Sequence, residues 1–322
     1  MEEDWTNFDA PRLAALAFSE LHLGKQDARY RTVRRGAQLF PMPAQLREEA
    51  GQLFTFLSKS FQEKGPYFGL QLGDKRMRVC AVPQQNGLCY VVKARTMAMM
   101  EWGKLGLPAA MDDLLVGRPL QGLTIVCGPE GTGKDLVSSS AFLERLRLHG
   151  GIGVSIGNHP PYPLNGTVGL SGISYQFLLD PERQKEAFRR ALRLNADHIL
   201  IYDPRDGESY KMALDLSAIG KNVILTLEAS TVPEALKYLV ERAILDSALH
   251  LYSNHAYRDF STRLADNLVS ILYLGPRKDN GKGNCRLHHV RFNDVTKSRI
   301  AAGEFDGIGF HSLSRRRSLE AA

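Results

Sequence analysis

The sequence predicts an α/β protein whose main domain has a mostly parallel sheet and follows a small α+β domain. From residue 122 onward, apolar strand-like runs alternate with helix-like segments, which is typical of a parallel sheet covered by helices. A glycine-rich loop at 128–134 separates the first of these strands from the first helix. Before residue 95, a helix-like stretch and a β-hairpin signal occur without that alternation.

The length of 322 residues suits two domains, because a single core usually stops growing below this size. We expect a small N-terminal domain at 1–95, a helix-containing linker at 96–121 and the α/β domain at 122–322.

Four segments are expected in the N-terminal domain before a hairpin. They are a short helix at 11–18, alternating segments at 19–23 and 29–39, and a helix at 44–61. Apolar residues at helical spacing support the second helix, namely Leu46, Leu53, Phe56 and Leu57. The hairpin is predicted because alternating apolar residues at 77–81 and 88–92 flank Asn86-Gly87, a dipeptide that favours a tight turn.

In the second domain, strands are expected at 123–127, 153–156, 198–202 and 222–227. Helices are expected up to about residue 149, from Pro181, up to Gly220 and from Thr231. The last of these begins with threonine, then proline and glutamate, which favour a helix start. A final hairpin is expected where strands at 269–274 and 285–292 flank Asp279-Asn280-Gly281.

The composition is that of an ordinary globular protein, with 43% hydrophobic and 24% charged residues. No apolar run approaches the roughly 20 residues that a membrane-spanning helix needs, and the acidic start of the chain is the opposite of a secretory leader. We therefore expect a cytoplasmic protein. The net charge of +6 would permit a nucleic-acid partner, but no motif of interleaved basic and aromatic residues supports one, and none is expected.

The four cysteines are Cys80, Cys89, Cys127 and Cys285. They are scattered, without a pair at C-x-x-C spacing, and three of them lie in strand-like apolar runs. Reduced, buried thiols are therefore expected rather than zinc ligands.

A phosphate-binding loop (P-loop) is predicted between the first strand and the first helix of the second domain. Residues 128–134 fit the pattern G-x-x-x-x-G-K, in the strand-to-helix context that supports this motif. Glycines allow successive backbone N–H groups to point at phosphate oxygens, and the helix N-terminus adds the positive end of its dipole. The predicted nucleotide-binding residues are Gly128, Gly131, Thr132, Gly133, Lys134 and Asp135. The alternative is a glycine-rich turn that binds nothing.

Asp135 departs from the usual motif. A serine or threonine hydroxyl normally binds magnesium at this position, whereas Asp135 brings a carboxylate. A carboxylate oxygen is an acceptable magnesium ligand, but a fixed negative charge beside the phosphates adds repulsion. The strength with which the chain binds ATP and Mg²⁺, the expected cofactors, is therefore in question.

Several segments resemble, in order and spacing, the PilT family of type IV pilus retraction ATPases and, more broadly, the hexameric motors of type II and type IV secretion. Residues 19–23 resemble the family's S-D-L-H-L strand, and residues 75–79 resemble its R-x-R-V strand. Residues 184–194 and 198–206 resemble the helix and the Walker B stretch that ends in G-E-x-R-D. Residues 218–227 resemble the segment that ends in T-L-H.

The resemblance implies a PAS-like N-terminal domain joined to a RecA-like P-loop ATPase domain, in a ring of six subunits with ATP between neighbours. It implies a homo-hexamer or a mixed ring with an active paralogue, and an inner-membrane platform protein of a pilus or secretion system as partner. The chain would then be cytoplasmic and peripheral at the inner membrane. Arginines of the N-terminal domain would reach the neighbour's phosphates, and Arg78 and Arg95 are the candidates, unless they are ordinary exposed strand residues.

The glutamate that positions water for hydrolysis in this family has no counterpart in this sequence. In the family it lies in an acidic segment after the second strand, which corresponds to residues 156–161 here. No Asp or Glu occurs anywhere from Arg145 through Leu179. His159 could accept a proton instead, or it could be a loop residue beside two prolines.

Two further positions differ from the family. Asp203 stands in place of the Walker B glutamate and could still hold magnesium through water, so Asp135 and Asp203 are the predicted metal ligands. Glu228 replaces the histidine after T-L and adds a second negative charge near the phosphates. The candidate catalytic residues are His159, Asp203 and Glu228. Arg205 is a third candidate for contact with phosphate, and Asp206 could be only a helix cap.

Two functions follow from these observations. The first is a degenerate traffic ATPase subunit that binds nucleotide with weak or absent hydrolysis and acts in a hexameric ring at a pilus, secretion or conjugation machine. The second is an active motor with drifted catalytic residues that powers pilus retraction or type IV secretion. A nucleic-acid-binding protein is a third reading, which a salt-sensitive affinity for DNA would favour.

Overall fold

The computed structural model describes residues 6–32, 38–73, 75–85, 87–95, 99–117, 121–157, 162–178, 184–204, 206–245, 254–275, 287–290, 293–308 and 310–313. The chain forms two compact units that divide between residues 98 and 99. The predicted limits of the domains and of the linker, at 95 and 122, stay predictions.

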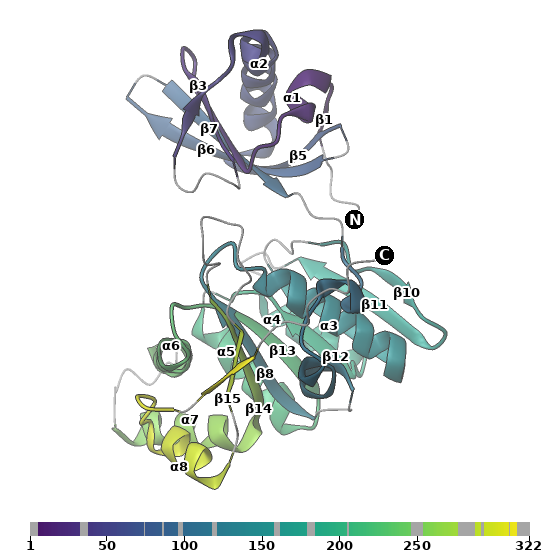
Figure 1. Ribbon diagram of the computed structural model, residues 1–322, viewed down its shortest axis with the longest axis vertical. Coiled ribbons are helices and arrows are strands. Elements are labelled where there is room, and N and C mark those ends of the chain that lie inside the picture. Colours follow the sequence, from purple (N-terminus) through teal and green to yellow (C-terminus); the bar gives the residue numbers. More distant parts are fainter. Residues whose placement is uncertain are drawn as a thin grey trace, which may run out of the picture. The chain divides into compact units, whose positions relative to one another are not determined.

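The first unit contains a seven-stranded sheet with two helices on one face (Figure 1). The strand order is β1-β5-β6-β7-β2-β3-β4. Its strands are β1 (Thr6–Phe8), β2 (Glu20–Leu23), β3 (Ala28–Arg31), β4 (Phe40–Pro41), β5 (Tyr67–Leu72), β6 (Lys75–Gln84) and β7 (Gly87–Arg95). The helices are α1 (Pro11–Ala15) and α2 (Arg47–Lys64), with a 3₁₀ turn at Ala44–Leu46 before α2.

Alternate strand residues form the core of the first unit beneath α2. Leu53 and Leu57 of α2 are buried in the same cluster as Met77 and Val79 of β6. Since successive strand side chains point to opposite faces, Arg78 lies on the face away from α2. The predicted hairpin and the predicted second helix are confirmed by β6, β7 and α2.

Other expectations for the first unit need correction. Helix α1 ends at Ala15 rather than at residue 18, because Leu16 adopts an extended conformation (φ −64°, ψ 130°) and Phe18 turns into the core. Of the alternating segment expected at 29–39, the start is confirmed by β3, which ends at Arg31, and residues 33–37 lie outside the described residues. Strands β1 and β5 were not predicted.

The second unit contains a nine-stranded sheet in the order β10-β11-β9-β12-β13-β8-β14-β15-β16. The strands from β11 to β14 in this order are parallel to their neighbours, and β10, β15 and β16 add antiparallel edges. Its strands are β8 (Gly122–Gly128), β9 (Gly151–Gly157), β10 (Gly166–Val168), β11 (Gly172–Leu178), β12 (His198–Ile201), β13 (Asn222–Glu228), β14 (Leu268–Leu274), β15 (Leu287–Val290) and β16 (Phe310–Leu313). The mainly parallel sheet is therefore confirmed.

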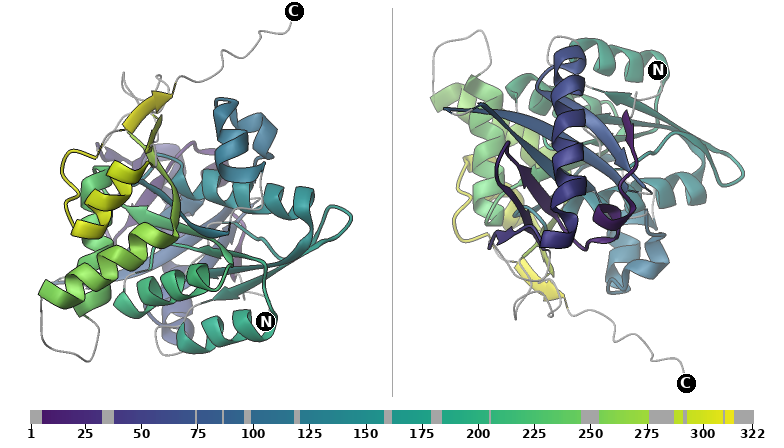
Figure 2. Two further views of the ribbon diagram at one scale, coloured as in Figure 1. Left: turned by 90° about the horizontal axis from the view of Figure 1, so that it is seen from below. Right: turned by 90° about the horizontal axis from the view of Figure 1, so that it is seen from above.

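Helices cover both faces of this sheet (Figure 1). One face packs against α3 (Lys134–His149) and against the turns Trp102–Leu105 and Asp112–Val116 of the preceding segment. The helices on the other face are α4 (Gln184–Arg193), α5 (Gly207–Ala218), α6 (Val232–Leu245), α7 (Asn254–Asn267) and α8 (Asp294–Ala302). Among them, α7 and α8 pack against each other (Figure 2).

The predicted strands of the second domain and its final hairpin are confirmed by β8, β9, β12, β13 and the β14–β15 pair. The predicted start of α6 is confirmed as well, since Thr231 Oγ1 accepts a hydrogen bond from the Glu234 N–H (3.2 Å) and the Glu234 carboxylate accepts one from the Ser230 N–H (2.8 Å). The expected helix start at Pro181 lies outside the described residues. Strands β10 and β11 were not predicted.

Three cysteines lie within the described residues, and their thiols are free. Cys127 is buried as predicted, and burial raises the pKa of its thiol to about 12. The expectation is wrong for Cys80 and Cys89, which are only half-buried, because both lie on the face of the first sheet away from α2. Cys285 lies outside the described residues. Within the described part of the chain, none of the helices combines the length and apolarity that crossing a membrane requires.

A buried arginine fastens the segment before β8 to helix α3. The Arg145 side chain is 1% exposed; its Nε donates a hydrogen bond to the Leu115 carbonyl oxygen, and its Nη1 donates one to the Asn222 side-chain oxygen. One turn later, His149 Nε2 lies 2.8 Å from the Val116 carbonyl oxygen. The C-terminal end of the Asp112–Val116 turn is therefore held by two side chains of α3.

His198 lies beside this arginine at the start of β12. Its Nδ1 is 3.3 Å from the Asn222 side-chain nitrogen, and its ring stacks on that of His149 with centroids 6.5 Å apart. Burial lowers the pKa of His198 to about 4, and the positive charge of Arg145 acts in the same direction. The imidazole is therefore neutral in the folded protein at neutral pH.

We predict that His198 makes the second unit sensitive to acid. Between pH 6.5 and pH 4 the unfolded chain binds a proton at this residue that the folded chain does not bind. The free energy of unfolding should therefore fall as the pH is lowered, by about 3 kcal/mol from this residue alone. Urea unfolding at several pH values would measure the loss, which His198→Gln should remove and His255→Gln, at an exposed position, should not. An unchanged pH dependence in His198→Gln would contradict the prediction.

Candidate nucleotide site

The predicted P-loop joins the end of β8 to the start of α3. Gly128 is the last residue of β8 and Lys134 the first residue of α3. Gly131 (φ +79°) and Gly133 (φ +89°) adopt left-handed conformations that other residues rarely take. The expected strand-to-loop-to-helix geometry is therefore present.

Gly128 is required for a different reason, which is the close approach of β14. A Cβ atom at this position would clash with the Leu274 carbonyl oxygen and lie 3.0 Å from Thr132 Oγ1. Thr132 Oγ1 itself donates a hydrogen bond to the Pro129 carbonyl oxygen (2.8 Å). The two ends of the loop are thus packed tightly, and the left-handed glycines between them leave backbone N–H groups able to face a ligand.

Lys134 is 7% exposed although it carries a charge. A buried ammonium group is costly unless it has a negative partner. At the first position of a helix that follows a glycine-rich loop, the partner that fits is a polyphosphate. The residues present therefore fit a nucleoside triphosphate.

Asp135 is the second residue of α3 and is half-buried. A carboxylate in the first turn of a helix is stabilised by the positive end of the helix dipole. Its backbone carbonyl oxygen accepts a hydrogen bond from Ser139 Oγ (2.5 Å). The position suits both a helix-stabilising carboxylate and a magnesium ligand.

Asp203 follows β12 at the carboxyl edge of the sheet. Its backbone is left-handed (φ +30°), which is uncommon outside glycine. The Asp203 N–H donates a hydrogen bond to Thr226 Oγ1 (2.9 Å), and its carboxylate accepts one from the Glu228 N–H (3.4 Å). One contact from β13 therefore holds the backbone of Asp203, and a second, longer one reaches its carboxylate.

Glu228 is the last residue of β13 and lies opposite Gly128 in the register of β13 and β8. Its side chain is exposed, and the next residue, Ala229, donates its N–H to the Gly128 carbonyl oxygen (3.4 Å). The structure thus brings Asp203 and Glu228 to the edge of the sheet where the P-loop begins.

The metal-ligand prediction has limited support in the geometry. Within the described residues, no group of three or more His, Cys, Asp or Glu side chains could hold a metal ion. Magnesium in nucleotide sites is commonly bound by one or two carboxylates together with water and phosphate. Asp135 and Asp203 therefore remain the predicted pair.

Other predicted residues lie elsewhere. His159 and Arg205 lie outside the described residues, as does the side chain of Arg95. Asp206 is the N-cap of α5, since its carboxylate accepts hydrogen bonds from the Ser209 N–H (2.9 Å) and the Ser209 hydroxyl (2.8 Å). The interpretation of Asp206 as a helix cap is confirmed.

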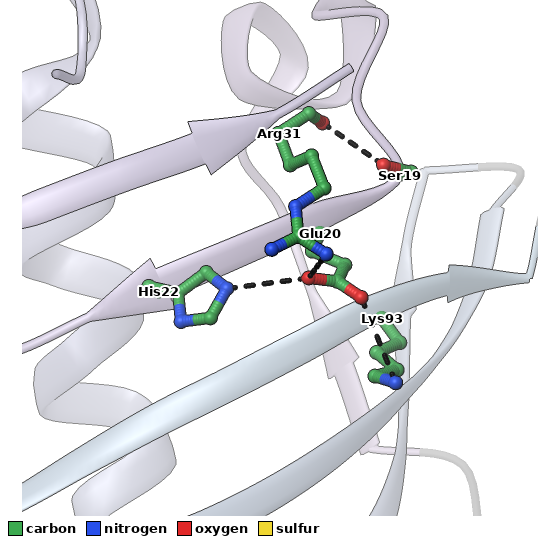
Figure 3. Close-up of polar contacts among 5 residues, drawn as sticks. All are labelled: Ser19, Glu20, His22, Arg31 and Lys93. Atoms are coloured by element: carbon green, nitrogen blue, oxygen red, sulfur yellow. Dashed lines mark hydrogen bonds and ion pairs between the residues drawn. The ribbon is translucent and has the colours of Figure 1, made fainter. Parts of the chain in front are cut away.

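Arg78 belongs to a basic face of the first unit's sheet. It lies opposite Lys93 in the β6–β7 register and is half-buried. On the neighbouring strands, Glu20 is surrounded by His22 Nε2 (3.3 Å), Arg31 Nη1 (3.1 Å) and Lys93 Nζ (3.6 Å), as Figure 3 shows. One carboxylate therefore offsets two permanent cations, so this face keeps a positive surplus.

Two residues near the P-loop were missed by sequence reasoning. Thr226 holds Asp203, and a threonine within an apolar strand was the available signal. Tyr202 lies beside α3, where its hydroxyl is 2.7 Å from Ser139 Oγ. No local pattern in the sequence pointed to that contact.

No family model matches the chain. Among curated proteins, it is 25% identical over 175 residues to the uncharacterized protein YggR of Escherichia coli (strain K12), covering 54% of this chain and 53% of that protein. It is 26% identical over 182 residues to the type II secretion system protein E of Klebsiella pneumoniae, covering 54% of this chain and 35% of that protein. The matches thus span about half the length of the first relative and about a third of the second.

Among solved structures, the chain is similar to the pilus retraction motor PilT with bound ADP. The TM-score is 0.68 at 21% identity, over 92% of this chain and 85% of that chain. This chain has the PilT-like ATPase fold. The expected resemblance to the PilT-like secretion ATPases is confirmed at the level of fold, and with it the RecA-like architecture of the second unit.

We predict that Gly128→Ala destabilises the chain far more than Gly131→Ala does. Alanine at 128 would collide with the Leu274 carbonyl oxygen, whereas a Cβ at 131 has no neighbour within 4 Å and only the left-handed backbone is unfavourable. We expect a loss of about 3 kcal/mol for the first variant and about 1 kcal/mol for the second. Denaturant unfolding would measure both, and equal losses would show that β14 does not constrain the loop.

Proposed function

We propose that this chain is a traffic ATPase subunit of a pilus or secretion machine that binds ATP with magnesium and hydrolyses it weakly or not at all. The observation that carries the proposal is the P-loop with its buried Lys134, next to a strand β9 that ends without a carboxylate. Phosphoryl transfer depends on positioning of water and metal rather than on covalent help. The chain keeps the cradle and lacks the residue that would position water.

The proposed site assigns a role to each group near the loop. Backbone N–H groups between Gly128 and Gly133 bind the phosphates, and Lys134 neutralises their charge. Asp135 and Asp203 hold magnesium, which when bound would neutralise phosphate charge. Glu228 adds negative charge at the same edge, which weakens ATP binding. Thr226 positions Asp203 through its hydrogen bond.

Further parts of the proposal concern assembly and location. The chain acts in a ring of six copies or in a mixed ring with an active paralogue, at the cytoplasmic side of an inner membrane, where it contacts the platform protein of its machine. Arg78 and Arg95 of one copy, and Arg205, approach phosphates. The basic sheet face that contains Arg78 supports this part, because guanidinium groups suit phosphate oxygens.

A second candidate is an active motor with drifted catalytic residues. The observation that favours it is the pair of hydrogen bonds that hold Asp203 against β13 at the carboxyl edge of the sheet. In this candidate His159 or a residue of a neighbouring copy positions the water. Steady-state kinetics separates the two candidates.

We predict that Lys134→Ala lowers the affinity for a fluorescent ATP analogue at least about tenfold in the presence of Mg²⁺, because it removes a charged contact to phosphate. The matched control is Lys237→Ala, an exposed lysine on α6 that forms a surface ion pair with Glu241. Binding that is equal in all three proteins would contradict nucleotide binding at this loop.

We predict that phosphate release from Mg²⁺-ATP by the purified chain stays at the level of the Lys134→Ala protein. The absence of a water-positioning carboxylate is the reason, since general base catalysis typically contributes about 10² to 10⁴ in rate. Turnover that Lys134→Ala abolishes would instead support the active motor.

We predict that the chain assembles into a ring. Light scattering at increasing concentration, with ATP and Mg²⁺, should approach the mass of six copies, because the site is completed by the basic face of a neighbour. The mass of one copy at every concentration would contradict a homo-hexamer and leave the mixed ring, which co-purification with a paralogue would test.

A further inference from the structure

Tyr202 fills the space between the ends of two strands and the P-loop helix. It follows β12 directly and is 6% exposed. Its N–H donates a hydrogen bond to the Ile156 carbonyl oxygen of β9 (2.9 Å). The side chain belongs to the cluster on the α3 face of the sheet, together with Leu136 and Val137 of α3.

The hydroxyl of Tyr202 is connected to the first turn of α3. It lies 2.7 Å from Ser139 Oγ, and Ser139 Oγ lies 2.5 Å from the Asp135 carbonyl oxygen. A serine hydroxyl has one proton to donate, and the carbonyl can only accept it. Tyr202 is therefore the donor to Ser139, and the chain of hydrogen bonds runs from Tyr202 through Ser139 to Asp135.

Gly157, the last residue of β9, has little room for a side chain. A Cβ atom there would lie 3.0 Å from the Tyr202 Cβ, 3.2 Å from its Cδ2 and 3.5 Å from its Cγ. The ring of Tyr202 thus occupies the direction in which any side chain at 157 would begin. The glycine and the tyrosine form a complementary pair.

This pair lies at the carboxyl ends of β9 and β12, directly before Asp203 of the proposed site, and ligands of open α/β sheets bind at this edge. A water molecule that attacks the terminal phosphate must be oriented by a base within hydrogen-bond reach. A side chain at 157 would start on the path from β9 toward Ser139 of α3, which the Tyr202 hydroxyl contacts. Here that path is filled by an aromatic ring.

We propose that Tyr202, anchored on Ser139, excludes a water-positioning carboxylate and its water from the nucleotide site, so that the chain holds ATP without cleaving it. The proposal rests on the proposed function, because it assumes that the P-loop binds ATP. Hydrolysis would then be prevented by the packing of Tyr202 as well as by the absence of one glutamate.

Four variants of the full chain test the proposal: Gly157→Glu, Tyr202→Gly, the double variant of both, and Tyr202→Phe. The control Tyr202→Phe keeps the ring and removes the hydroxyl. Each protein is assayed for binding of a fluorescent ATP analogue and for phosphate release from Mg²⁺-ATP. We expect the double variant to release phosphate at least about tenfold faster than the wild type, and the other three to stay within about twofold of it.

The outcomes separate this inference from the proposed function. A double variant that binds the analogue like the wild type but releases phosphate no faster would overturn the inference. So would a Gly157→Glu protein as active as the double variant, because the ring would then exclude nothing. Absence of analogue binding in every protein, the wild type included, would overturn the proposed function itself.

If Gly157→Glu does not fold, a double-mutant cycle measured by melting temperature tests the inference instead. Gly157→Ala adds only the Cβ atom that meets Tyr202. It should lower the melting temperature in the wild-type background and have a much smaller effect in the Tyr202→Gly background. Equal effects in the two backgrounds would show that glycine and tyrosine are not a complementary pair and would overturn the inference.

Discussion

The second unit depends on the close approach of helix α3 to the parallel sheet. Gly153 of β9 allows this approach, because a Cβ atom there would lie 2.5 Å from Leu146 Cδ1 and 2.7 Å from Phe142 Cζ. Helix α3 starts at Lys134, so its distance from the sheet also sets the position of the P-loop. A side chain at 153 would force Leu146 and Phe142 of α3 to move, since interiors are densely packed.

The two ends of α3 serve different parts of the unit. Its first turn follows the predicted P-loop, and its last turns hold the segment before β8 through Arg145 and His149. Arg145 binds neutral oxygen atoms of Leu115 and Asn222 and is buried, which lowers its pKa to about 9. It stays protonated at neutral pH, and the Leu115 carbonyl group at the end of a helical turn provides partial negative charge beside it.

The charges around the cradle are arranged in two opposing sets. Lys134 and the start of α3 favour phosphate, while Asp203 and Glu228 place carboxylates at the ends of β12 and β13. A bound divalent cation would reduce the repulsion between the carboxylates and the phosphates, because it adds positive charge between them. The same arrangement without a cation would repel a triphosphate, so ATP affinity and magnesium are expected to be linked.

Much of the fold could be predicted from the sequence, because its signals are local. The strand β8, the loop after it and the helix α3 follow from an apolar run, a glycine pattern and a helical period. The hairpin of β6 and β7 follows from alternation around Asn86-Gly87. Strands β1 and β10 have only three residues each, too few for a period to be recognised. In strand β11, glycine and serine alternate with apolar residues. Small residues occur there because α3 approaches the strand closely, so the usual pattern of buried apolar residues is absent.

By itself the sequence determined the glycine-rich strand-to-helix loop and the absence of a carboxylate between residues 145 and 179, since both are properties of contiguous residues. Only the tertiary structure decided that Asp203 is held by Thr226 and that Tyr202 fills the space above Gly157. Tyr202 and Ser139 are 63 positions apart in the chain. Contacts of that kind depend on which strands become neighbours and on how near a helix lies to them, and no local pattern of residue types carries that information.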